Sequence, residues 1–269
     1  MLRFRPLTVT TEWCRGLVRI VLEDRAPQTI KYFSAISKGD LPLTIALLID
    51  TSASIRDKLD DEKRTAAEFL RSIVRKEKDS ALLIDFNSEV NLVHDFTPNP
   101  EALIAAMQAL RAGGSTALYD AISFAVDEKL KSETGRKVIV VITDGDDTIS
   151  KVGEGKAIET AQEHDVLIYG IGIRGDSHDA NFGVLRRFAE ETGGRFISSR
   201  ATPNEMQAAF QSIRQELQNQ YSLAYTSTNT HRDGSYRSIE VHCKRGGVRI
   251  RTRKGYYAPT PQKQAMISD

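Results

Sequence analysis

Side chains with oxygen atoms gather at three places in this sequence. Asp50, Ser52 and Ser54 alternate in the segment DTSAS, Thr116 ends the segment GGST, and Asp144 lies in the segment TDG. One carboxylate followed at two-residue steps by two hydroxyls offers three hard oxygen atoms from a single loop. Such oxygens are the ligands that Mg²⁺ prefers, at roughly 2.0 to 2.1 Å. The five residues Asp50, Ser52, Ser54, Thr116 and Asp144 therefore predict a divalent cation site.

The elements around these segments explain how they could meet. Asp50 follows the apolar run LPLTIALLI (41–49), Asp144 follows KVIVVIT (137–143), and Thr116 precedes a helical pattern at 117–131. In open α/β sheets, ligands bind outside the carboxyl ends of the strands, so three such loops can converge on one ion. An alternative for the first loop alone is that Asp50 closes a turn while Ser52 or Ser54 caps the following helix.

The middle of the chain predicts a doubly wound, mainly parallel α/β sheet flanked by helices. The runs at 41–49, 80–86, 137–143 and 165–173 are almost continuously apolar, which is typical of central strands covered on both faces. The segment 89–96 follows 80–86 after two residues, which favours an antiparallel hairpin at a sheet edge. Helical periodicity predicts six helices. They are expected at 57–76, 100–110, 117–131, 155–164, 181–192 and 204–217.

Both ends of the chain change character. The segments 7–10, 17–22 and 28–34 alternate apolar and polar residues, as do 220–227, 236–243 and 247–253. Three half-buried strands at each terminus cannot form a stable core separately, so we expect them to combine in one small β domain. The expected division is 1–40 and 219–258 for this domain, 41–218 for the α/β domain, and 259–269 for a flexible tail.

The three segments DTSAS, GGSTALYDAI and VVITDGDD together resemble the metal-ion-dependent adhesion site of von Willebrand factor A (VWA) domains. The family pattern maps residue by residue onto Asp50, Ser52, Ser54, Thr116 and Asp144. This resemblance implies a Rossmann-like fold over about 41–217, with hydroxyls that contact Mg²⁺ or Mn²⁺ directly and carboxylates that often act through water. Ca²⁺ is a weaker expectation, because it requires more ligands.

The resemblance also implies a function. VWA domains of this kind bind a protein partner whose Asp or Glu side chain completes the coordination of the cation. In the family, exchange of the ligand can move the last helix of the domain, here 204–217. The segments NQYSLAYTSTNTHRDGSYRSIEVHCKRGGVRIRTRKGYYAP and VLEDRAPQTIKYFSA are similar to the ends of VWA-related proteins described from Acidobacteria, which are commonly exported. Periplasmic or extracellular location is therefore an expectation, although the segment MLRFRPLTVT lacks the apolar stretch of a signal peptide.

Composition argues against several other classes of protein. The 37 Lys and Arg residues balance 36 Asp and Glu residues, so no global field favours nucleic acid or an anionic membrane. No apolar run reaches the roughly 18 residues of a membrane-spanning helix. Cys14 and Cys243 fit no metal-ligand spacing, and their pairing as a disulfide and the oligomeric state remain open.

Several weaker signals favour structural explanations. The segment GIGIRG (170–175) matches a dinucleotide-binding pattern, but its first glycine lies within a strand, so tight packing is the preferred interpretation. Asp120 could orient a metal-bound water, or it could simply be an acid in the first turn of a helix, where the helix dipole favours negative charge. Asp146 and Asp147 are expected to be solvated, with a supporting role at the metal as the alternative. The basic segment 244–254 is expected to expose Arg249, Arg251 and Arg253 on an outer face, with a patch for an acidic partner or a membrane surface as the alternative.

Two other functions compete with the binding module. A phosphoryl-transfer enzyme with Asp50 as nucleophile would need a second carboxylate two residues on, where this chain has Ser52. A scaffold with a vestigial metal site is the other alternative, and the complete ligand set argues against it. We therefore interpret the chain as a non-enzymatic, cation-dependent protein-binding module.

Overall fold

The computed structural model describes residues 5–10, 18–36, 41–145, 147–174, 182–200, 202–243 and 250–260. The chain divides into two compact units. The central unit is Lys38–Gln215, and the terminal unit combines Met1–Ser37 with Glu216–Asp269. Within the described residues, no helix is both long and apolar enough to cross a membrane.

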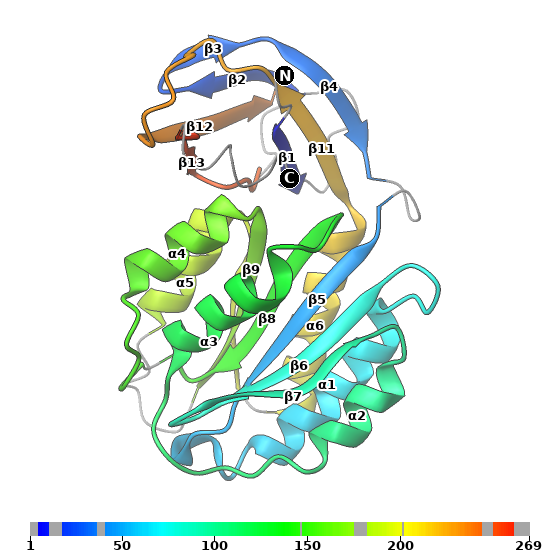
Figure 1. Cartoon of the computed structure of the whole chain (residues 1–269). Helices are drawn as coiled ribbons and strands as arrows, with labels where there is room; N and C mark the ends of the chain where they lie inside the picture. Colours follow the sequence, from blue (N-terminus) through cyan, green and yellow to red (C-terminus); the bar gives the residue numbers. More distant parts are fainter. Residues whose placement is uncertain are drawn as a thin grey trace. The chain divides into compact units, whose positions relative to one another are not determined.

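The central unit contains a six-stranded sheet in the order β10-β9-β8-β5-β6-β7 (Figure 1). Its strands are β5 (Leu43–Asp50), β6 (Ser80–Phe86), β7 (Val90–Thr97), β8 (Arg136–Thr143), β9 (Val166–Arg174) and β10 (Phe196–Arg200). All neighbouring strands are parallel except β7, which pairs antiparallel with β6 at one edge. The four continuous apolar runs thus form the four inner strands, and the predicted edge hairpin is confirmed.

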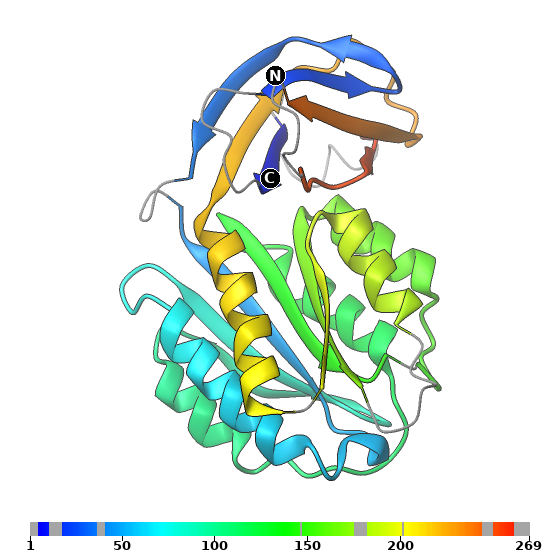
Figure 2. The ribbon, with the colours of Figure 1, turned by 180° about the vertical axis from the view of Figure 1, so that it is seen from behind.

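Helices cover both faces of this sheet. Figure 1 shows α3, α4 and α5 in front of it, and Figure 2 shows α1, α2 and α6 on the other face. Their bounds are α1 (Leu59–Ile73), α2 (Pro100–Met107), α3 (Leu118–Phe124), α4 (Glu154–Glu163), α5 (Gly183–Thr192) and α6 (Pro203–Gln218). Every residue of β5 is buried, because its side chains alternate between two covered faces. The expected fold class, a mainly parallel sheet flanked by helices, is confirmed.

Some elements differ from the sequence-based expectations. The helix expected at 57–76 begins only at Leu59, after a 3₁₀ turn at Ala53–Ile55. The helix expected at 117–131 continues beyond α3 as a π-helical segment, Ala125–Leu130. Strand β10 was not predicted. The interpretation of the glycine-rich segment is supported, because a Cβ on Gly172 would lie 2.7 Å from the ring of Phe182.

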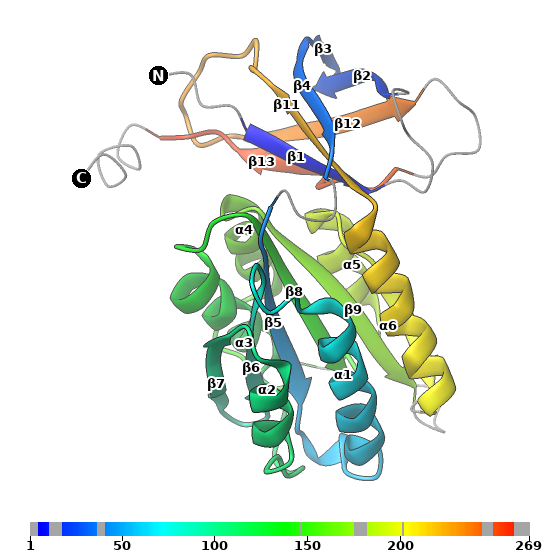
Figure 3. The same ribbon diagram turned by 90° about the vertical axis from the view of Figure 1, so that its right-hand side faces the viewer.

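The described residues of the terminal unit form two small sheets with the orders β1-β11-β4 and β13-β12-β2-β3. Its strands are β1 (Arg5–Thr10), β2 (Val18–Glu23), β3 (Ala26–Gln28), β4 (Ile30–Ala35), β11 (Gln220–Tyr225), β12 (Tyr236–Cys243) and β13 (Gly255–Tyr257). Strands from the two ends of the chain pair directly, β1 with β11 and β12 with β2 (Figure 3). The small β domain built from both termini is therefore present. Its apolar core includes Val21, Leu223 and Ile239.

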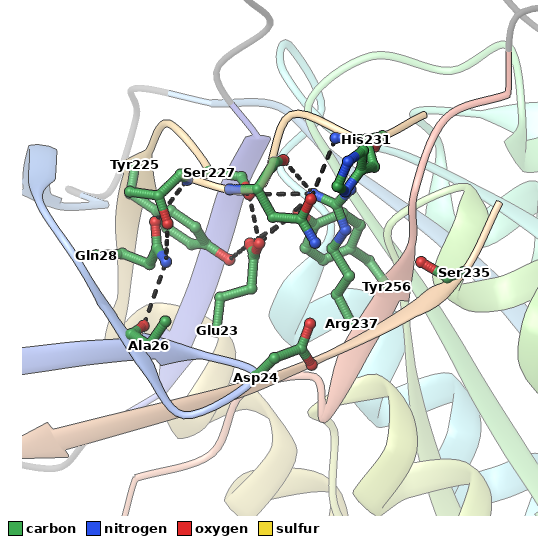
Figure 4. A network of polar contacts seen from close by, with 12 residues as sticks. Glu23, Asp24, Ala26, Gln28, Tyr225, Ser227, His231, Ser235, Arg237 and Tyr256 are labelled. Carbon is green, nitrogen blue, oxygen red and sulfur yellow. Dashed lines mark hydrogen bonds and ion pairs between the residues drawn. The ribbon is translucent and has the colours of Figure 1, made fainter. Parts of the chain in front are cut away.

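A buried polar network also holds the terminal unit together (Figure 4). The carboxylate of Glu23 accepts hydrogen bonds from the hydroxyls of Tyr225 at 2.7 Å, Tyr256 at 2.8 Å and Ser227. Arg237 lies 3.5 Å from the same carboxylate, and both side chains are almost completely buried. Burial, and then the hydrogen bond to Glu23, raise the pKa of Tyr225, so this hydroxyl remains a donor.

The basic segment before β13 was predicted incorrectly. Arg253 is buried, with its guanidinium 5.7 Å from the ring centre of Tyr256, and Arg251 donates a hydrogen bond of 2.7 Å to Glu216. These two arginines therefore form neither a solvated face nor a free patch for an acidic partner. Arg249 and Cys14 lie outside the described residues.

Candidate metal centre

Asp50 is the last residue of β5, and its carboxylate is completely buried. Oδ1 accepts a hydrogen bond of 2.8 Å from the backbone N–H of Ser52. Oδ2 accepts one of 2.5 Å from the hydroxyl of Thr143, the last residue of β8. The carboxylate is thus held between two neighbouring strand ends, and each oxygen retains further acceptor capacity.

The two serines of the first loop present their hydroxyls together. Ser52 Oγ and Ser54 Oγ lie 3.0 Å apart, with Ser52 buried and Ser54 exposed. Neither serine caps helix α1, whose N-cap residue is Lys58, and the 3₁₀ turn after Ser52 receives no side-chain cap. The alternative of a helix-capping role is therefore wrong, and both hydroxyls remain available for another function.

Backbone hydrogen bonds join the first loop to the second. The N–H of Gly113 donates to the carbonyl of Thr51 at 2.8 Å, and the N–H of Ala53 donates to the carbonyl of Gly114 at 3.1 Å. Gly114 has φ +84°, a conformation that other residues rarely adopt. This pair of bonds fixes the loop that carries Thr116 beside the loop that carries Ser52.

The second loop is joined in turn to the third. The N–H of Thr116 donates to Oγ1 of Thr148 at 2.9 Å, and the N–H of Thr148 returns a bond of 2.8 Å to the carbonyl of Thr116. Asp144 begins this third loop directly after Thr143, and it is half-buried. Asp50 is linked to Asp144 through Thr143, and to Thr116 through Gly113 and Gly114. All five predicted ligands thus lie on three mutually bonded loops at the carboxyl ends of the strands.

The pKa of Asp50 reflects its burial and its neighbours. Burial raises the pKa of its carboxyl to about 6, and the negative charge of Asp144 also contributes. The hydrogen bonds from Thr143 and Ser52 lower the pKa and partly offset the burial. Burial and the charge of Asp144 both disfavour the ionised form of Asp50. A cation bound beside Asp50 would stabilise that ionised form.

Two other acidic residues of the region have structural roles. Asp147 was expected to be solvated, but it is half-buried and accepts hydrogen bonds from the N–H of Tyr119 at 3.0 Å and the hydroxyl of Ser150 at 2.5 Å. Asp120 accepts hydrogen bonds from the N–H groups of Lys151 and Val152. Both carboxylates therefore fix the third loop against α3. Asp146 lies outside the described residues.

Sequence reasoning missed two residues around the centre, Thr51 and Thr143. The hydroxyl of Thr51 donates to Asp85 at 2.9 Å and accepts a bond of 3.2 Å from the amide of Asn87, which ties the first loop to the end of β6. Thr143 was treated only as part of a strand. Its position could have been found from the register, since β5 and β8 run parallel with Ile49 opposite Ile142, which places Asp50 beside Thr143.

The donor set fits a magnesium-type cation. Among the described residues, no three His, Cys, Asp or Glu side chains are grouped closely enough to bind an ion alone. A centre at this edge would therefore combine the carboxylates of Asp50 and Asp144 with the hydroxyls of Ser52, Ser54 and Thr116. Neutral hydroxyls with few carboxylates suit a small hard cation, because they leave positions for water.

Comparison with known proteins agrees with this fold. The von Willebrand factor type A domain family matches residues 44–233, so the chain belongs to this family. An uncharacterised protein from Borreliella burgdorferi is 27% identical over 137 residues, which are 48% of this chain and 40% of that protein. The chain thus spans about two fifths of the length of this curated relative.

Solved structures show the same fold at low sequence identity. A von Willebrand factor type A protein from Catenulispora acidiphila has a TM-score of 0.57 at 12% identity and covers 98% of this chain and 75% of its own. The von Willebrand domain of the type V pili tip protein Mfa5 from Porphyromonas gingivalis has a TM-score of 0.52 at 15% identity, with coverages of 66% and 95%. Proximal thread matrix protein 1 from the mussel byssus, with a zinc-occupied MIDAS motif, has a TM-score of 0.59 at 14% identity. The match covers 74% of this chain and 50% of that protein.

Proposed function

We propose that this chain is a protein-binding module whose binding depends on a divalent cation held by Asp50, Ser52, Ser54, Thr116 and Asp144. The observation that supports the proposal is the pairwise bonding of the three loops that carry these five residues, at the carboxyl ends of the strands. Mg²⁺ or Mn²⁺ is the proposed ion, because the oxygen donors are mostly neutral.

A bound cation would supply a Lewis-acidic position for an acidic side chain of the partner protein. The chain itself contributes the rest of the site: Asp50 and Asp144 supply negative charge, and the hydroxyls of Ser52, Ser54 and Thr116 supply neutral donors. Such a set does not fully neutralise a divalent ion, so an Asp or Glu of the partner is the ligand that best completes it. The zinc-occupied MIDAS motif of the mussel byssus protein supports a metal at this position in the family.

An enzyme that uses Asp50 as a nucleophile is a poorer explanation. Such an enzyme would require a second carboxylate two residues after Asp50, and this chain has Ser52 there. A scaffold with a vestigial site is also disfavoured, because Ser52 and Ser54 are not used as helix caps.

Calorimetric titration of the metal-stripped chain with Mg²⁺, Mn²⁺ and Ca²⁺ tests the proposal. We expect saturable binding of Mg²⁺ or Mn²⁺ at one site, and its loss in Asp50→Ala. Asp60→Ala is the matched control, since the Asp60 side chain is 99% exposed and should not affect the site. No binding by the wild-type chain at millimolar metal would contradict the proposal.

A pull-down with immobilised chain tests the protein partner. The captured protein should be released by chelator, should return with Mg²⁺, and should be absent with the Asp50→Ala variant. A partner that binds equally with and without chelator would support the scaffold instead.

A further inference from the structure

One large apolar side chain lies exposed on the loops of the candidate metal centre. Ile149 belongs to the third loop and is 43% exposed. Among the described residues only five large apolar side chains are exposed, and three of them lie in the terminal unit. The fourth, Leu41, precedes β5 at the end opposite to Asp50. Single exposed apolar residues are common on protein surfaces, so the position of Ile149 decides whether it has a role.

Backbone hydrogen bonds place Ile149 beside a proposed ligand of the cation. The N–H of Ile149 donates to the carbonyl of Thr116 at 3.3 Å, and the N–H of Thr148 donates to the same carbonyl at 2.8 Å. Because standard bond lengths join these atoms to their Cα atoms, the Cα atoms of Ile149 and Thr116 can be at most about 7.5 Å apart. This distance corresponds to about two residues of an extended peptide, which spans roughly 3.3 to 3.6 Å per residue.

Polar neighbours hold the segment around Ile149 in place. Asp147 accepts hydrogen bonds from the N–H and the hydroxyl of Ser150, at 3.2 and 2.5 Å. Asp120 of α3 accepts a hydrogen bond of 2.9 Å from the N–H of Val152. The Val152 side chain packs against the apolar core, whereas the Ile149 side chain of the same segment is exposed. A side chain on a segment held in this way loses less conformational freedom on binding than one on a loose loop.

We propose that Ile149 makes an apolar contact with the partner protein, and that the partner's acidic residue has an apolar residue one or two positions away along its chain. This inference rests on the proposed function of the site, and it narrows the partner from any exposed acid to an acid beside an apolar side chain. Removal of the two apolar side chains from water adds affinity to the bond between carboxylate and cation. A partner acid without such a neighbour leaves Ile149 in water and binds more weakly.

A random peptide library displayed on phage tests the inference. The library is selected on the immobilised chain in Mg²⁺, and bound phage is eluted with chelator. We expect the eluted peptides to contain Asp or Glu with an apolar residue one or two positions away. Ile149→Ser should select acidic peptides without this apolar preference, and it should bind the wild-type peptides roughly tenfold more weakly, because the apolar contact is lost. Ile149→Leu should retain the preference.

Leu41→Ser provides the matched control, because Leu41 is 39% exposed in the same unit. The length of β5 separates it from Asp50 by roughly 20 Å or more. Leu41→Ser should select the same peptides as the wild type. In calorimetric titration, each variant should have the Mg²⁺ dissociation constant of the wild type, since neither side chain is a proposed ligand.

Acidic peptides without an apolar preference on the wild-type chain, or the same preference on Ile149→Ser, would overturn the inference and leave the proposed function intact. A loss of the preference in Leu41→Ser would also overturn it, since the effect would not belong to the site. Weaker Mg²⁺ binding by Ile149→Ser would overturn it as well, because the residue would then act on the ion rather than on the partner. Absence of chelator-eluted peptides from the wild-type chain would contradict the inference and the proposed function together.

Discussion

The hydroxyl of Thr143 donates a hydrogen bond to the buried carboxylate of Asp50, with 2.5 Å between Oγ1 and Oδ2. The bond joins the ends of two neighbouring parallel strands, β8 and β5. The same hydroxyl accepts a bond of 3.1 Å from the N–H of Gly145, so it also fixes the start of the third loop. One side chain therefore sets the position of Asp144 relative to Asp50.

Thr143→Val should weaken both the fold and the site. The substitution keeps the shape but removes the only donor that this side chain offers to Asp50, which should cost about 1.5 to 3 kcal/mol of unfolding free energy. We expect the Mg²⁺ dissociation constant to rise roughly tenfold, as for other residues that orient a metal ligand. Denaturant unfolding and calorimetric titration measure the two effects.

Thr192→Val is the control for this substitution. Thr192 is equally buried, donates to the carbonyl of Phe188 at 2.7 Å and lies at the end of α5. The substitution Thr192→Val should lower the free energy of unfolding by a similar amount and leave the Mg²⁺ affinity unchanged. Equal effects of the two substitutions on Mg²⁺ affinity would show that the Asp50–Thr143 bond has no special role.

The raised pKa of Asp50 predicts a pH dependence of metal-free stability. Its pKa is about 6 in the fold against an ordinary value of 3.8, so folding favours the protonated form. The stabilising contribution is complete below about pH 4 and is lost as the pH rises to about 6, by roughly 3 kcal/mol in total. Relative to Asp50→Asn, the chelated wild-type chain should therefore lose stability between pH 4 and 6 and remain constant above. Parallel pH profiles of the two proteins in denaturant unfolding would contradict this expectation.

The inner strands and the three loops could be predicted because the sequence marks them locally. Continuous apolar runs indicate strands covered on both faces, and an acid or hydroxyl directly after such a run must lie at the sheet edge. Strand β10 was missed because its sequence, FISSR, is short and only partly apolar, as an edge strand permits. The burial of Arg253 was missed because alternation assigns a face without showing which tertiary neighbours cover it.

Buried and half-buried acids outside the proposed ligand set were harder to predict than that set. Glu62 belongs to an acidic first turn that resembles an ordinary favourable helix start, and only the packing of α1 shows that it is buried. Asp147 belongs to an acidic loop, and its bond to the N–H of Tyr119 depends on the approach of α3. Both environments result from long-range packing, which one sequence does not record.

Gly114 and Gly113 should respond very differently to alanine. A Cβ on Gly114 would lie 2.7 Å from Oγ of Ser88, and its φ of +84° adds strain, whereas a Cβ on Gly113 meets nothing within 4 Å. Gly114→Ala should cost about 1 to 3 kcal/mol and weaken Mg²⁺ binding, because it displaces the loop that carries Thr116. Gly113→Ala should change neither quantity. Calorimetric titration measures the Mg²⁺ affinity of both variants. Equal affinities would show that the loop tolerates displacement.

The ion pair between Glu23 and Arg237 should behave as a coupled unit in the terminal unit. The two side chains are 1% and 3% exposed, and Arg237 also donates to the carbonyl of Asn229 at 2.7 Å. Arg237→Met leaves a buried carboxylate without its cation, and Glu23→Gln leaves a buried guanidinium without its anion. Each single substitution should cost about 3 to 5 kcal/mol.

The double variant should be less destabilised than the sum of the two single variants, by about 1 to 3 kcal/mol, because the second substitution removes a group that is already unpaired. Denaturant unfolding of the four proteins gives this coupling energy directly. Mg²⁺ affinity should remain unchanged in all of them, since the three loops lie in the central unit. Strict additivity of the two losses would mean that the hydroxyls of Tyr225 and Tyr256, rather than Arg237, neutralise Glu23 in the fold.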